Sequence, residues 1–269
     1  MRYLIKYSII FILLSIISNC KNKERGSNNF NEQIQKTSMG NALLIGMKKT
    51  ELDGYSNVAT RYSSYNVSRI KKILKKENFS TIKVLESPKG NLILKELKAQ
   101  VDNLKNDDFL VVYYFGHGGQ KQDINGDEDD GEDETLVALD REILDDEIYE
   151  ILVGTNKTSR VFFVIDACNS GSSIKLLNDK YHKGILEKKI TPTLDIIYLG
   201  ATSDGTKVPA NAFTKIIYKE WSKLKSNEGY IDFFKKVEAK MNQNHDIFPV
   251  LDLSMSKDVK YQKKPPFKI

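Results

Sequence analysis

The sequence predicts an α/β protein, with a mainly parallel sheet of roughly six strands and helices on both faces. Short, continuously apolar segments alternate with segments whose apolar residues recur every three or four positions, the spacing of an amphipathic helix. Strands that are apolar throughout are typical of a parallel sheet covered on both sides. The 269 residues, 40% hydrophobic and 29% charged, suffice for one large globular domain.

The apolar runs place the strands, and the periodic segments place the helices. The clearest strands are FLVVYYF at 109–115 and VFFVI at 161–165. Further strands are expected at 41–46, 81–85, 136–139, 196–199 and 248–253, and helices at 62–76, 92–104, 145–152, 213–224 and 231–241. The acidic stretch 120–134 and the charged segment 179–194 lack such patterns, so we expect a loop and a linker there.

The first 19 residues have the features of a secretory signal peptide. Arg2 and Lys6 flank the start, and the apolar run at 7–17 is shorter than the roughly 20 residues that span a bilayer. An uncleaved membrane anchor is the alternative. Residues 20–38 are polar and aperiodic, which predicts a flexible tether before a folded domain at 39–269.

The end of this signal, Ile17-Ser18-Asn19-Cys20, resembles a bacterial lipoprotein signal, in which cleavage occurs just before a lipid-modified Cys. Asn19 departs from the usual Gly or Ala before that Cys. The resemblance implies a protein exported to the bacterial cell envelope and anchored to a membrane by lipid on Cys20. Two or more acyl chains give stable anchoring.

Composition argues against several other classes of protein. The chain has two Cys and three His, too few for a disulfide framework or a zinc cluster. The net charge of +5 comes mainly from scattered Lys, which is typical of solvated helix faces. We therefore expect no nucleic-acid partner.

Two reactive side chains each follow a predicted strand directly. His117 comes after 109–115, and Cys168 comes after 161–165. Sites in parallel sheets form at the carboxyl ends of strands, so these residues are expected to meet. A thiolate is a strong nucleophile, and a neighbouring His can activate it and then protonate a leaving amine.

Backbone N–H groups at such a turn can stabilise an oxyanion, and we expect those of Gly118 and Cys168 to do so. This chemistry requires no cofactor. The alternative is structural, with Cys168 a buried apolar residue and His117 a turn residue. Cys168 lies beyond its strand, between polar and glycine residues, and this placement favours a site.

The surrounding motifs resemble those of metacaspases. YYFGHGGQ at 113–120 is similar to the histidine motif of that family, and VIDACNSGS at 164–172 is similar to its cysteine motif. Between them, DGEDETLVALD at 130–140 and ILDDEI at 143–148 match in order and spacing. The resemblance implies the caspase-like three-layer α/β/α sandwich and a cysteine endopeptidase that acts on protein or peptide substrates after Arg or Lys, through a thioester acyl-enzyme.

The resemblance carries over to the substrate pocket only in part. The family's basic-residue pocket uses an Asp two positions before the nucleophile, and Asp166 stands there; its alternative role is to cap a turn. The family's Gly-Cys-x-Asn-Asp loop appears here as GYSNV at 54–58, with Val58 in place of the Asp. Phe115 replaces the Ser before the Gly-His-Gly motif.

Many members of the family need calcium, and the match places three of its ligands at Asp133, Asp145 and Asp146. Lys175 stands at the position of the fourth ligand, for which Asp179 is a nearby substitute. Helix capping is the alternative role for Asp145 and Asp146. The acidic run at 123–134 lacks EF-hand spacing, and two interpretations stay equally open: that it attracts a cation by itself, or that it is a solvated loop.

The lysines of the linker suggest self-cleavage after basic residues, since exposed linkers are cut readily. Two other functions stay open. One is a catalytically silent caspase-like lipoprotein used for binding or regulation. The other is acyl transfer rather than hydrolysis, because both reactions pass through an acyl-enzyme.

Overall fold

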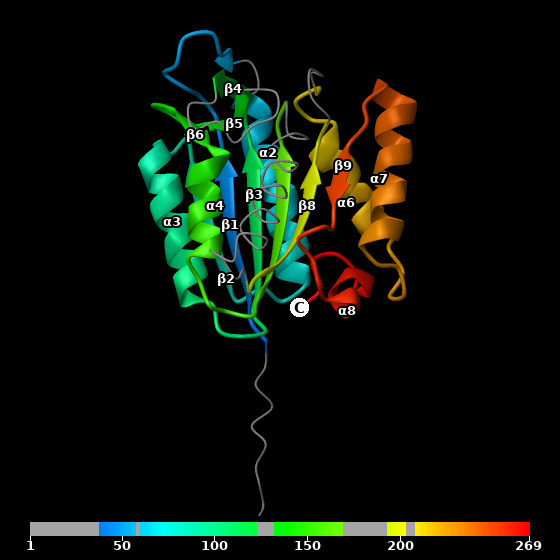
Figure 1. Ribbon diagram of the computed structural model, residues 1–269. Helices are drawn as coiled ribbons and strands as arrows, with labels where there is room; N and C mark the ends of the chain where they lie inside the picture. Colours follow the sequence, from blue (N-terminus) through cyan, green and yellow to red (C-terminus); the bar gives the residue numbers. More distant parts are fainter. Residues whose placement is uncertain (1–37, 58–59, 123–131, 169–192, 203–207) are drawn as a thin grey trace, which may run out of the picture. The chain divides into compact units, whose positions relative to one another are not determined.

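A six-stranded sheet in the order β2-β1-β3-β7-β8-β9 forms the centre of the molecule (Figure 1). The computed structural model describes residues 38–57, 60–122, 132–168, 193–202 and 208–269. The strands are β1 (Gly40–Gly46), β2 (Thr81–Glu86), β3 (Phe109–Phe115), β7 (Arg160–Asp166), β8 (Asp195–Gly200) and β9 (Val250–Asp252). All neighbours pair in parallel except β8 and β9. The predicted mainly parallel sheet is confirmed.

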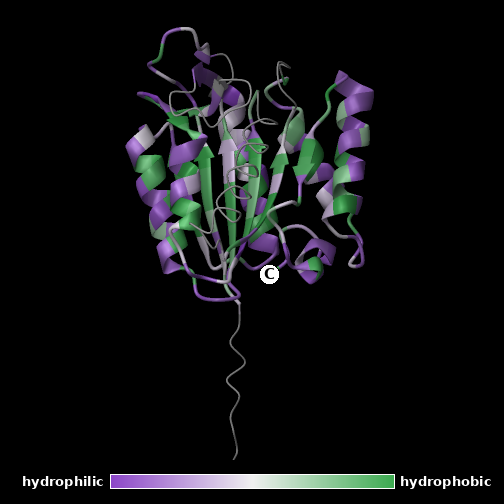
Figure 2. Cartoon of the chain, in the orientation of Figure 1, coloured by the Kyte–Doolittle hydropathy of each residue, from purple (hydrophilic) through white to green (hydrophobic). Residues whose placement is uncertain are grey.

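Helices cover both faces of the sheet, which completes the three layers. One apolar core lies between the sheet and α2 (Thr60–Lys76), α6 (Phe213–Trp221) and α7 (Tyr230–His245). A second core lies against α3 (Gly90–Asn103) and α4 (Asp145–Val153). The short α8 (Val259–Lys263) adds the buried ring of Tyr261 to the first core. Figure 2 shows the apolar strands inside and the polar surfaces of the helices outside.

The alternation of side chains along each strand explains why the sheet needs both helical layers. In β7, Phe162 and Val164 belong to the first core, whereas Phe163 and Ile165 belong to the second. Successive side chains of a strand point to opposite faces, so a strand that is apolar throughout has two faces to bury. This geometry leaves the strand ends as the places where polar chemistry is accessible.

A second, three-stranded antiparallel sheet was missed in part by the sequence prediction. It consists of β4 (Gly118–Gln122), β5 (Glu132–Val137) and β6 (Glu142–Leu144). A loop was expected at 120–134, but 120–122 and 132–134 belong to strands, and 123–131 lie outside the described residues. The strand expected at 136–139 begins earlier, at Glu132, and ends at Val137. The strands are polar, so no apolar alternation marks them. Cross-strand pairing, including Lys121 opposite Asp133, forms them instead.

Several other element ends differ from the predicted bounds. The helix expected at 213–224 ends at Trp221, and the strand expected at 248–253 is reduced to the three residues of β9. The helix expected at 231–241 continues to His245, where Asp246 with φ of 54° ends it in the left-handed conformation. End caps of this kind are set by local backbone geometry, which apolar periodicity does not report.

The predicted signal peptide at 1–19 and nearly all of the predicted tether at 20–38, with Cys20, lie outside the described residues. The same holds for the linker at 179–194, apart from its last two residues. Among the helices of the described part, none has the length and apolar character needed to cross a membrane.

The first core generates a prediction about stability. Phe162 is completely buried and makes edge contacts with the rings of Tyr230 and Phe267, at centroid distances of 4.9 and 5.1 Å. We expect Phe162→Ala to lower the free energy of unfolding by about 3–5 kcal/mol, because it leaves a cavity at the centre of the sheet. Phe248→Ala, at a ring that is 53% exposed, is expected to change it by less than about 0.5 kcal/mol. Urea unfolding followed by circular dichroism measures both, and equal effects would contradict this account.

Candidate active site

The register of the two central strands brings the predicted catalytic pair together. Phe115, the last residue of β3, pairs with Asp166, the last residue of β7. His117 and Cys168 each follow two residues later, at equivalent positions beyond the same edge of the sheet. Neighbouring strands lie about 4.8 Å apart, so the two turns are adjacent.

Backbone contacts show that the two turns meet. The amide of Gly116 donates to the carbonyl oxygen of Asp166 over 3.3 Å. A methyl group added at Gly118 would overlap the carbonyl oxygen of Cys168, so only glycine permits this approach. Both His117 and Cys168 are half-buried.

The imidazole of His117 is oriented by the chain that follows β1. Its Nε2 lies 2.7 Å from the carbonyl oxygen of Ser56. A carbonyl oxygen can only accept, so Nε2 carries the proton of the neutral ring and Nδ1 is left as the acceptor. The ring of Tyr55 lies beside it, with centroids 5.4 Å apart. This tautomer suits a general base that receives a proton at Nδ1.

The backbone of His117 is held from the other side by the second sheet. Its carbonyl oxygen accepts from the amide of Val137 over 3.0 Å and lies 2.8 Å from the hydroxyl of Tyr114. The Tyr114 hydroxyl also lies 2.8 Å from the carbonyl oxygen of Val137. The turn between β3 and β4 is therefore fixed at His117 itself.

Asp166 lies beneath the site, on the face of the sheet that α6 covers. It is 3% exposed, and its carboxylate accepts from the hydroxyl of Thr214 over 2.5 Å and from the Thr214 amide over 3.3 Å. Burial raises the pKa of Asp166 to about 7, against the lowering effects of the Thr214 hydrogen bonds and the charge of Arg69. Its predicted role in binding a basic side chain and the alternative turn-capping role both remain predictions.

The three predicted calcium ligands lie on the second sheet and the helix after it. Asp133 is buried in β5, and Asp145 begins α4 and is 4% exposed. The amide of Asp146 donates to a carboxylate oxygen of Asp145 over 3.0 Å. Both residues lie in the first turn of α4, where carboxylates favour the helix dipole.

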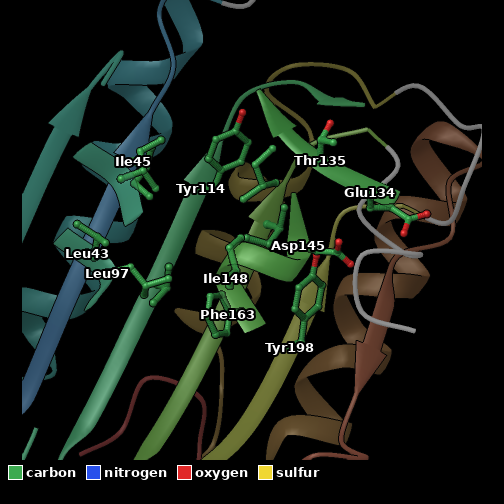
Figure 3. A pocket seen from close by; sticks show the side chains of 14 residues that line it. Leu43, Ile45, Leu97, Tyr114, Glu134, Thr135, Asp145, Ile148, Phe163 and Tyr198 are labelled. Atoms are coloured by element: carbon green, nitrogen blue, oxygen red, sulfur yellow. The ribbon is translucent and has the colours of Figure 1, made fainter. Parts of the chain in front are cut away.

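Figure 3 shows Asp145 with Glu134 at the wall of a mostly apolar cavity between the sheet and the α3–α4 layer. Within the described ranges, no three His, Cys, Asp or Glu side chains are arranged to hold a metal ion. Lys175 and Asp179 lie outside these ranges, so calcium binding stays a prediction.

Sequence reasoning missed the residues that support the pair. Tyr55 and Ser56 contact His117, and Thr214 binds Asp166. Tyr55 belongs to the GYSNV segment at 54–58, which departs from the metacaspase loop pattern. The family pattern has a Cys at this position, and the larger side chain of Tyr55 is the signal in the sequence that indicates a special contact here. Nothing in the periodicity of 213–221 marks Thr214.

Comparison with known sequences identifies the family. The family described as "Metacaspase, peptidase C14 domain" matches residues 41–177. The chain belongs to the metacaspase family. Among metacaspases, it is 34% identical over 169 residues to Metacaspase-1 of Eremothecium gossypii, and this match covers 57% of the chain and 37% of the relative.

Two further relatives extend this comparison. Metacaspase-1 of Schizosaccharomyces pombe is 31% identical over 179 residues, covering 61% of this chain and 41% of its own. Metacaspase-3 of Arabidopsis thaliana is 44% identical over 94 residues, and this match covers 33% of this chain and 26% of the relative. The matches thus span at most about two fifths of the length of these relatives.

Solved structures support the caspase-like fold. A protein from Geobacter sulfurreducens superimposes with a TM-score of 0.66 at 22% identity, covering 86% of this chain and 99% of that one. Caspase-1 from Spodoptera frugiperda superimposes with a TM-score of 0.54 at 14% identity, covering 82% and 91%. The predicted caspase-like sandwich of this metacaspase is therefore confirmed.

The buried carboxyl group of Asp166 generates a prediction about pH. Its pKa is about 7 in the folded chain and 3.8 ordinarily, so between these values the folded state holds a proton that the unfolded state has lost. This group therefore favours folding at acidic pH, and its contribution is lost as the pH rises towards about 7. Relative to Asp166→Asn, the wild type should lose about 3 kcal/mol of stability between about pH 5 and pH 8.

Urea unfolding at a series of pH values measures this difference. Thr214→Val removes a hydrogen bond that lowers the pKa, so its loss of stability should extend to higher pH than that of the wild type. Parallel curves of stability against pH for the wild type and Asp166→Asn would contradict the raised pKa of Asp166 in the folded chain.

Proposed function

We propose that this chain is a cysteine endopeptidase in which Cys168 is the nucleophile and His117 the general base and acid. The observation that carries the proposal is the meeting of the two turns, where Gly118 lies against the carbonyl of Cys168. Membership of the metacaspase family supports the same reaction class.

The reaction follows from the tautomer of His117. Nδ1 accepts the proton of the Cys168 thiol as Sγ attacks the substrate carbonyl carbon, and Nε2–H stays bound to the Ser56 carbonyl. The amides of Gly118 and Cys168 are the donors proposed for the oxyanion. The imidazolium then protonates the leaving amine, and water hydrolyses the thioester.

We also propose a preference for Arg or Lys before the cleaved bond, with Asp166 as the source of the preference. Asp166 is the last residue of β7, two positions before Cys168, and a buried carboxylate there favours a cationic substrate side chain nearby. Phe115 and Val58 stand where the family pattern has Ser and Asp, so this pocket has fewer polar groups than that pattern provides. Asp166 is then the main electrostatic determinant.

Calcium activation and self-cleavage within 179–194 are further proposals. Their support is the family pattern at Asp133, Asp145 and Asp146, together with the lysines of the linker. No catalytic step passes through the ion in this scheme, because the chemistry requires only the thiol, the imidazole and backbone amides.

Export and anchoring complete the proposal. The apolar run at 7–17 followed by Cys20 supports an exported lipoprotein held on a membrane of the bacterial cell envelope. The lipid would keep the peptidase close to proteins or peptides at that membrane.

One assay tests the enzymatic proposal. The chain is incubated with reporter peptides ending in Arg, Lys or Asp, with calcium or with a chelator. We expect Cys168→Ala and His117→Ala to lower turnover by at least about 10³-fold, because both remove a reacting group. Cys20→Ala, which removes the other Cys of the chain, is the matched control and should retain activity.

Each arm of the assay tests a separate part of the proposal. Calcium should raise turnover, and incubation with calcium should give fragments that Cys168→Ala does not give. Preference for the Asp peptide would overturn the role of Asp166 and spare the catalytic pair. No turnover dependent on Cys168 under any condition would favour a catalytically silent binding lipoprotein, whereas transfer of the acyl group to an added amine would indicate acyl transfer.

The anchoring proposal predicts a change at Cys20. Expressed in a bacterium, the wild-type chain should appear in the membrane fraction with an added lipid mass on Cys20. Cys20→Ala should lose that mass, and Cys168→Ala should keep it as the matched control. Membrane association without lipid in the wild type would instead support the uncleaved anchor. Fractionation with mass spectrometry distinguishes these results.

A further inference from the structure

His117 needs support from outside its own turn. Glycines flank it on both sides, and it lies in the short span between β3 and β4. Glycine allows many backbone conformations, so the local chain does little to restrict the direction of the imidazole. A catalytic base has to be held within a fraction of an ångström of its working position.

Two consecutive residues provide that support from the segment after β1. The carbonyl oxygen of Ser56 lies 2.7 Å from Nε2 of His117, which sets one direction of the ring. The ring of Tyr55 lies against the imidazole at a centroid distance of 5.4 Å and an interplanar angle of 43°. The imidazole could still rotate about the axis of its hydrogen bond to Ser56, and the Tyr55 ring restricts that rotation.

Tyr55 is in turn fixed by the second sheet. Its hydroxyl donates to Oε1 of Glu142 over 2.9 Å. The other carboxylate oxygen of Glu142 lies 3.4 Å from the hydroxyl of Thr135 and 3.6 Å from Nζ of Lys121. The Glu142 side chain is 12% exposed, so this carboxylate sits at a largely enclosed junction of β4, β5 and β6.

Two further observations support this contact. A methyl group at Gly119 would overlap the hydroxyl of Tyr55, so the glycine next to the catalytic turn keeps room for it. Burial and the hydrogen bond to Glu142 raise the pKa of Tyr55, so its hydroxyl stays protonated and able to donate throughout the neutral range.

The segment is also tied within itself and to the connection between β5 and β6. The hydroxyl of Thr50 donates to the carbonyl oxygen of Ala138 over 2.9 Å, and the Thr50 amide donates to the side chain of Asn57 over 2.9 Å. The amide of Glu51 donates to the carbonyl oxygen of Leu139 over 2.7 Å. The position of Tyr55 and Ser56 is thus set by the second sheet rather than by β1 alone.

From this arrangement we propose that Tyr55 is a positioning residue for the His117 imidazole and that Glu142 holds Tyr55 in place from the second sheet. The inference rests on the proposed function, since it concerns the base of the same reaction. It is particular to this chain, because a Cys, as in the metacaspase loop pattern, is too short to reach from the histidine to Glu142.

The test measures how fast iodoacetamide alkylates Cys168, with the modified peptide quantified by mass spectrometry so that Cys20 does not contribute. Tyr55→Phe keeps the ring and loses the bond to Glu142, and we expect it to slow alkylation about threefold. Tyr55→Leu should slow alkylation about tenfold, and Glu142→Ala should slow it about threefold. Tyr65→Phe, at an exposed ring of α2, is the matched control and should match the wild type.

Peptide turnover provides a second readout that a purely structural role would not move. In Tyr55→Phe and Glu142→Ala, kcat should fall by the same factor as alkylation while KM stays within about twofold. The double variant that combines Tyr55→Phe with Glu142→Ala should have a kcat no lower than that of the slower single variant, because both changes remove one shared contact. Thermal melting confirms that each variant is folded, and Tyr55→Phe is the mildest of them.

These results separate the inference from the proposed function. If the wild type cleaves no peptide but Cys168 alkylation depends on His117, Tyr55 and Glu142, the endopeptidase proposal fails and the positioning role stands. If peptides are cleaved and both Tyr55 variants keep wild-type kcat and alkylation rates, the positioning role is overturned. A rise in KM alone would also overturn it, since it would make Tyr55 a substrate contact.

Discussion

The parallel pairing of β3 with β7 is the constraint on which the candidate site depends. It joins the histidine and cysteine motifs at one register, with Phe115 opposite Asp166, and so places both turns at the same edge of the sheet. A shift of one residue would reverse the faces of every side chain on one strand. Because these strands are buried on both faces, two separate apolar cores resist such a shift.

Polar groups at this edge are supported from the α6 layer and from the second sheet. On one side, Asp166 is buried against Thr214 of α6, which connects the end of β7 to the α6 layer. On the other side, the carbonyl of His117 is bound by Val137 of β5. The reactive turns are therefore fixed although glycine surrounds them, and a fixed geometry is what acyl-transfer chemistry requires.

The second sheet has a larger role than its size indicates. It begins at Gly118, one residue after His117, and its last strand carries Glu142, which contacts Tyr55. Leu136 and Ile143 of this sheet pack into the second core, and its polar contacts hold the residues around His117.

Sequence alone determined the sheet class, the main strands and helices, the family motifs and the proposal of His117 and Cys168 as a pair, because apolar periodicity and short motifs are local properties of the chain. Only the tertiary structure decided that Tyr55, Ser56 and Glu142 surround His117 and that Thr214 binds Asp166. These contacts join residues 48 to 87 positions apart in the chain. They depend on register and on side-chain direction, and neither leaves a pattern in the sequence. The two turns could be expected to meet, but what holds them in working geometry could be read only from the fold.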